Sequence, residues 1–156
     1  MRQMTVDEIR AHDLRRARMH EAAHCMVARH LGYKTKWTTY DNLIGNSMEA
    51  ILENKLMLGI CAFYEGPVDP RHGAMIGLAG ELIHMLEPGE YGDNYSADTH
   101  MDEIFEYFED EVILLSASDA KMAGSFSAED IDECMQLLIK LRPAILLEVE
   151  ERKHCD

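Results

Sequence analysis

The sequence predicts an α+β fold that is predominantly helical, organised as a single domain over residues 1–156 with a small sheet. Three observations lead to this class. Apolar residues recur at helical spacing in most of the chain, two short segments have strand patterns, and no repeat or composition shift marks a domain boundary. At 47% hydrophobic residues, the chain has enough apolar side chains for one core.

The first predicted helix covers about residues 6–31. It opens with the capping box Thr5-Val-Asp-Glu8 and continues with small and apolar residues at helical spacing. Asp13 marks a candidate break within it. Gly32 directly follows the last periodic residue, as is typical of a helix C-terminus.

Two strands should follow this helix. Residues 33–41 alternate with a period of two, which predicts a half-buried strand. Gly45-Asn-Ser47 marks a turn, and the apolar run over residues 56–64 predicts a second strand that is short and buried.

The second predicted helix covers residues 73–86 and ends before Pro88-Gly89. Its small residues Gly77, Ala79 and Gly80 leave room for a closely packed neighbour. This helix is therefore expected to lie in the interior of the fold.

The C-terminal half is predicted to be helical apart from a polar loop over residues 90–97. A third helix, over residues 101–108, has an acidic, solvated outer face. Ser127-Ala-Glu-Asp130 resembles a capping box and opens another helix, which Pro143 should bend or restart before the last helix ends near Lys153.

The charge balance narrows the range of partners. With 29 Asp and Glu against 15 Lys and Arg, the formal net charge is −14, which argues against nucleic-acid and anionic-membrane binding. The longest apolar run, residues 56–64, is far shorter than the roughly 20 residues of a membrane span. The first residues lack the apolar core of a secretory signal, so we expect a cytoplasmic protein with reduced, structural cysteines.

His20-Glu-Ala-Ala-His24 is an HExxH motif inside the first predicted helix. Residues four apart on a helix lie about 40° apart around its axis, so both imidazoles can bind one zinc ion. Glu21 lies about 100° from His20, where it can reach a zinc-activated water as a general base without being a ligand. A shuffled sequence of this composition would contain the motif only about 0.04 times.

The residues around the motif resemble the peptidase domain of the FtsH-like zinc metalloproteases. The segments that carry the resemblance are His20-Glu-Ala-Ala-His-Cys-Met-Val-Ala-Arg-His-Leu-Gly32 and Ile76-Gly-Leu-Ala-Gly-Glu-Leu-Ile83. It implies a mainly helical, zincin-like metallopeptidase with two histidine ligands, a glutamate base and an aspartate ligand from the start of a later helix. Ala23 replaces the family's usual glycine, and His84 stands where a glutamate is common. The sequence contains no phosphate-binding-loop motif, and we expect no membrane anchor.

The third metal ligand has three candidates. Asp98 follows the small residues Ser96-Ala97, much as the family's aspartate follows a small-residue turn, although aspartate before a helix is often only a cap. The family spacing without a gap leads instead to His100, and Asp102 is a further candidate. We favour Asp98 because the family's ligand is a carboxylate.

These observations predict a stand-alone zinc peptidase of the HExxH type, with His20, His24 and Asp98 as Zn²⁺ ligands and Glu21 as the catalytic base. Its substrates would be peptides or unfolded proteins, and a homo-oligomer or a separate ATPase are candidate partners. The alternative is a non-catalytic, zinc-stabilised module for protein interaction. An open fourth coordination position would favour the enzyme, and a fourth protein ligand such as His84 or His100 would favour the structural site.

Overall fold

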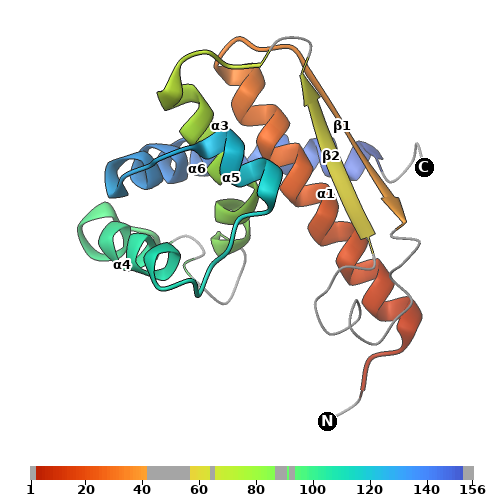
Figure 1. The fold of residues 1–156 in the computed structure, drawn as a ribbon. Coiled ribbons are helices and arrows are strands. Elements are labelled where there is room, and N and C mark those ends of the chain that lie inside the picture. The colour runs from red at the N-terminus through yellow and green to blue at the C-terminus, as the bar shows by residue number, and fades with distance from the viewer. Residues whose placement is uncertain (1–2, 42–56, 64–65, 87–90, 92–93, 153–156) are drawn as a thin grey trace.

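The computed structural model describes residues 3–41, 57–63, 66–86, 91 and 94–152 (Figure 1). Its elements are predominantly helical and include one two-stranded antiparallel sheet, which confirms the predicted α+β class. In chain order they are α1 (Val6–His30), β1 (Thr35–Asp41), β2 (Met57–Phe63), α3 (Pro70–Met85), α4 (Ala97–Glu109), α5 (Ala117–Ala123) and α6 (Ala128–Arg152).

Helix α1 is continuous from its N-terminal cap to His30. Thr5 Oγ1 accepts a hydrogen bond from the backbone N–H of Glu8, and the Glu8 carboxylate accepts one from the backbone N–H of Thr5, which confirms the capping box. The predicted break at Asp13 is wrong, because this side chain is only 1% exposed and faces the interior without interrupting the helix. Gly32, with φ at +97°, provides the left-handed turn after the helix.

Strands β1 and β2 pair with Trp37 opposite Cys61 and Thr39 opposite Gly59. In β1 the alternation is as predicted over the first four residues, since Thr35 and Trp37 are buried whereas Lys36 and Thr38 are exposed. The prediction that β2 is buried is wrong, because Ile60 is 53% exposed. A two-stranded sheet that packs on one helix has only one covered face, so Ile60 and Ala62 on the other face are exposed.

Helix α1 lies between the sheet on one side and helices α3 and α6 on the other (Figure 1). Helix α5 packs on α3, and α4 packs on α6. The largest fully buried side chains of this arrangement are Met19, Ile76, Leu78, Leu82, Ile83, Leu86, Ile104, Ile131, Met135, Leu138 and Ile145.

Several helix boundaries differ from the sequence prediction. Helix α3 begins at Pro70, because Asp69 caps it by accepting a hydrogen bond from the backbone N–H of Arg71. Helix α5 was not predicted, and α6 runs through Pro143 without restarting. The predicted turn at residues 45–47 and the Pro88-Gly89 stop lie outside the described residues. Within the described part of the chain, none of the helices combines the length and apolar composition that crossing a membrane requires.

Candidate metal centre

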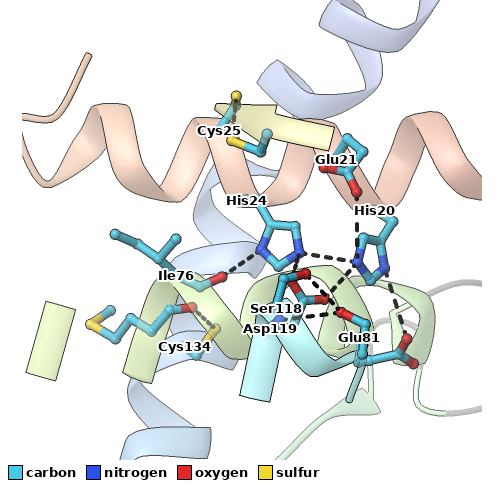
Figure 2. Close-up of polar contacts among 12 residues, drawn as sticks. His20, Glu21, His24, Cys25, Ile76, Glu81, Ser118, Asp119 and Cys134 are labelled. Atoms are coloured by element: carbon cyan, nitrogen blue, oxygen red, sulfur yellow. Dashed lines mark hydrogen bonds and ion pairs between the residues drawn. The ribbon is translucent and has the colours of Figure 1, made fainter. Parts of the chain in front are cut away.

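The two histidines and the glutamate of the HExxH motif lie close together on α1 (Figure 2). The Nε2 atoms of His20 and His24 are 3.0 Å apart, and His20 Nε2 lies 4.0 Å from Glu21 Oε1. One potential ligand atom from each of the three residues falls within 4.8 Å of the others. This group could therefore hold a metal ion, as the motif predicts.

His24 is fixed by a bond on the side of its ring away from His20. The residue is 4% exposed, and its Nδ1 lies 2.6 Å from the carbonyl oxygen of Ile76 in α3. A carbonyl can only accept, so Nδ1 carries the proton and donates it. In the neutral ring the lone pair is then on Nε2, directed toward His20, which is the tautomer that a metal ligand needs.

A carboxylate from α5 completes this cluster. Asp119 Oδ2 lies 3.0 Å from His20 Nε2, and Asp119 Oδ1 lies 3.2 Å from His24 Nε2 (Figure 2). Burial alone would raise the pKa of Asp119, but its hydrogen bonds with the two histidines outweigh this effect and hold the pKa below its usual range. Asp119 is therefore an anion at neutral pH.

The same contact acts on His24. Burial alone would lower the pKa of His24, but the hydrogen bond with Asp119 and the nearby carboxylates outweigh it and raise this pKa. Without a metal, a proton shared with Asp119 therefore stabilises the pair. A metal cation between the same atoms would replace that proton.

Glycines of α3 allow these elements to approach so closely. A Cβ at Gly77 would lie 2.6 Å from the backbone nitrogen of Ala123, and one at Gly73 would lie 2.7 Å from the carbonyl oxygen of Met122, so α5 rests directly on this helix. A Cβ at Gly80 would overlap the Nε2 atoms of both histidines. The predicted close packing around Gly77 and Gly80 is thus confirmed, and the neighbours are α5 and the imidazoles.

The side chain of Glu21 extends from α1 toward strand β2. Glu21 is 7% exposed, and a Cβ at Gly59 of β2 would overlap its side chain. Burial is the largest influence on this carboxyl and raises its pKa, against the smaller opposing effects of His24 and His20. Glu21 therefore holds a proton more readily than an exposed glutamate does.

Two further side chains of α3, those of Glu81 and His84, contact the His20 ring. Glu81 Oε1 lies 3.8 Å from His20 Nδ1, on the opposite side of the ring from Asp119. The His84 ring stacks on that of His20 with centroids 5.8 Å apart. Burial, with a contribution from Arg16, lowers the pKa of His84 to about 2, so this ring is neutral.

The sequence-based candidates for the third ligand occupy other positions. Asp98 and Asp102 are exposed on α4. His100 Nδ1 accepts a hydrogen bond from the backbone N–H of Ser96, 2.9 Å away, and its ring packs against Tyr91. The carboxylate that contacts both imidazoles is Asp119, which the sequence analysis did not consider.

A signal for Asp119 is present in the sequence. Asp119 follows Ser116-Ala-Ser118, a small-residue turn like the one before Asp98. Ser116 Oγ accepts a hydrogen bond from the backbone N–H of Asp119, 3.2 Å away. Both aspartates occupy the first turn of a helix. Local sequence does not distinguish them, whereas their positions in the fold do.

The donor set fits a zinc ion. A tetrahedral site with zinc–nitrogen distances of about 2.05 Å has ligand atoms about 3.3 Å apart. The separations between His20 Nε2, His24 Nε2 and the Asp119 oxygens are 3.0–3.2 Å, close to this value. Two imidazoles and a carboxylate are also ligand types that zinc commonly takes.

No protein-family model and no curated protein matches this sequence. The chemistry of the site is therefore inferred from its own donor atoms and their surroundings.

Proposed function

We propose that this protein is a zinc-dependent peptidase in which His20, His24 and Asp119 bind the metal and Glu21 is the catalytic base. The observation that carries the proposal is the convergence of two Nε2 atoms and one carboxylate within 3.2 Å, with the buried Glu21 beside them. Asp119 takes the place of Asp98 as carboxylate ligand, because Asp98 is exposed on α4.

Each residue has a distinct part in the reaction. When bound, zinc supplies Lewis-acid chemistry that acidifies a water and polarises a peptide carbonyl. Glu21 takes the proton of that water on its carboxylate and returns it to the leaving amine. The carbonyl of Ile76 holds His24 in its ligand tautomer, and Gly80 leaves the two imidazoles room to converge.

The burial of Glu21 suits it to this work. A base transfers protons best when its pKa lies near the working pH, and burial raises the pKa of Glu21 in that direction. The Glu21 carboxylate lies beside the histidines and is not one of the proposed ligands, so protonation of Glu21 would leave the metal ligands unchanged. This division between ligands and base is what a hydrolytic site needs.

The ligand assignment is tested by zinc affinity. We expect the purified protein to bind about one zinc per chain. Asp119→Ala should lose at least about 100-fold in affinity, since even residues that only support a ligand contribute 10- to 100-fold. Asp98→Ala is the matched control, because it removes an aspartate from the first turn of a helix away from the histidines. Equal affinities for both variants would refute the role of Asp119.

The catalytic assignment is tested by Glu21→Gln. With zinc bound, this variant should cleave a denatured protein or a peptide library about 10²- to 10⁴-fold more slowly than wild type. Zinc content and the circular dichroism spectrum should not change, because the amide has nearly the same shape. A wild-type protein that cleaves no faster than Glu21→Gln at equal zinc occupancy would refute the peptidase.

The alternative function is a non-catalytic interaction module stabilised by zinc, and the proximity of Glu21 to the histidines makes Glu21 its candidate fourth ligand. Its oxygen lies within the 4.8 Å group, so Glu21 as a fourth ligand would close the site and make it a structural element of a binding module. In that case Glu21→Gln would weaken zinc binding together with stability. Unchanged zinc affinity in this variant supports the peptidase instead.

A further inference from the structure

Two free cysteines, Cys25 (Figure 2) and Cys61, face each other where helix α1 contacts strand β2. Cys25 Sγ on α1 lies 2.9 Å from Cys61 Sγ on β2. A disulfide bond is about 2.05 Å long, so the two sulfur atoms would need to approach by only about 0.9 Å. Their separation of 36 residues in sequence gives no hint of this pairing.

The contact belongs to a regular match between helix and strand. Glu21 packs against Gly59, and Cys25, one turn further along α1, packs against Cys61, two residues further along β2. Four helical residues rise about 6.0 Å and two strand residues rise about 6.6 Å, so the two pairs stay in step. The sulfur atoms therefore meet as a consequence of the way β2 lies on α1.

We propose that Cys25 and Cys61 form a reversible disulfide that ties β2 to α1. The proposal does not depend on peptidase activity. It concerns a covalent bond between two elements that are far apart in sequence and already in contact.

The different exposures of the two thiols set the order of the chemistry. Cys61 is partly exposed and Cys25 is fully buried. A low-molecular-weight disulfide is therefore attacked first by Cys61, which forms a mixed disulfide, and the Cys61 proton leaves with the first small thiol. Cys25 then attacks Cys61 Sγ, and the Cys25 proton leaves with the second small thiol. Two protein thiols are oxidised and one small disulfide is reduced to two thiols.

The third described cysteine, Cys134, has a different environment. Cys134 is buried in α6, and its Sγ donates a hydrogen bond to the carbonyl oxygen of Met75, 3.3 Å away. Cys155 lies outside the described residues. Cys134→Ser therefore serves as a matched control that removes one thiol and leaves the proposed pair intact.

The first test is disulfide mapping on the full chain, with and without zinc, after incubation with oxidised glutathione. We expect one cross-linked peptide pair containing Cys25 and Cys61, loss of two of the four thiols, and full reversal by dithiothreitol. Cys134→Ser should give the same cross-link and Cys61→Ser should give none. A chain that retains all its thiols, or cross-links Cys134 or Cys155 instead, would overturn the proposal.

The second test measures thermal unfolding of the oxidised and reduced forms. The cross-link closes a loop of more than 30 residues, so the oxidised protein should melt about 5–15 °C higher. Cys61→Ser, treated in the same way, should show no difference between the two conditions. An oxidised wild type that melts at the same temperature as the reduced form would show that the bond does not tie the two elements together.

Discussion

Replacing Gly80 by alanine should weaken the proposed zinc site although every donor side chain remains. The added Cβ would lie 2.5 Å from His20 Nε2 and would also overlap His24 Nε2, whereas ordinary contacts begin at about 3.4 Å. The imidazoles would have to retreat by about 0.9 Å. Metal–ligand distances in working sites hold to about ±0.2 Å, so at least one bond to zinc would be lost.

The size of the effect follows from this displacement. Loss of one ligand should weaken zinc binding by at least about 100-fold, or about 2.8 kcal/mol of binding free energy. Overpacking should also reduce the free energy of unfolding of the metal-free protein by about 1–3 kcal/mol. For a chain of this size, that corresponds to a fall in melting temperature of about 2–12 °C.

Both quantities can be measured on one preparation. Zinc affinity comes from competition with a chromogenic chelator, and stability comes from thermal circular dichroism of the metal-free protein. Gly66→Ala is the matched control, because a Cβ at Gly66 meets no atom within 4 Å. Zinc binding by Gly80→Ala within about threefold of wild type would refute the reasoning that this glycine makes room for the ligands.

Three further perturbations address other parts of the structure. Gly77→Ala should push α5 and Asp119 away from the histidines, because its Cβ would lie 2.6 Å from the Ala123 nitrogen; calorimetric titration should show weaker zinc binding by a protein that still folds. Because the pKa of His24 is raised in the folded protein, its pairing with Asp119 stabilises the metal-free protein below pH 6.5, and this stabilisation is lost as the pH rises through the folded pKa. Because the pKa of Asp119 is lowered, its contribution to stability is complete above pH 3.8 and is lost as the pH falls through the folded pKa. Urea unfolding should therefore show the largest difference between wild type and Asp119→Asn from about pH 4 to 6.5, whereas zinc affinity should increase with pH above this range because zinc displaces the His24 proton. Pro143→Ala should raise the free energy of unfolding by about 1–3 kcal/mol, measured by thermal melting, because α6 continues through an exposed proline that lacks a backbone N–H.

The part of the site that could be predicted from sequence is the part that one helix determines. His20 and His24 share a face of α1 because the helical repeat places residues four apart close together, and Glu21 lies beside them. The small residues of α3 likewise predicted a close neighbour from local composition alone. In both cases the relevant geometry is contained within a few turns.

The third ligand, the carboxylate of Asp119, could not be predicted in this way. Asp98 and Asp119 both follow a serine and small residues at the start of a helix, so their local patterns are equivalent. What separates them is the packing of α5 on Gly73 and Gly77, a contact between residues more than 40 positions apart. A helix as short as α5 also gives too little periodicity to be recognised.

The wrong expectations of a buried β2 and of a helix restart at Pro143 have a similar origin. An apolar run indicates a strand, but its burial depends on how many layers cover the sheet, and here α1 covers one face only. A proline favours a helix boundary, but the packing of Ile145 and Val149 into the core beyond it keeps α6 continuous. Tertiary contacts outweighed the local preference in both segments.

The shortness of α5 has a thermodynamic consequence for the site. An isolated helix of seven residues is unstable in water, so Asp119 is held in place only while α5 is docked on α3. In the proposed zinc site, metal binding and the docking of α5 would then be linked equilibria, and the apparent Kd would equal the intrinsic Kd divided by the fraction of molecules with α5 docked. A change that undocks α5 would weaken metal binding by the same factor, even when it touches none of the proposed ligands.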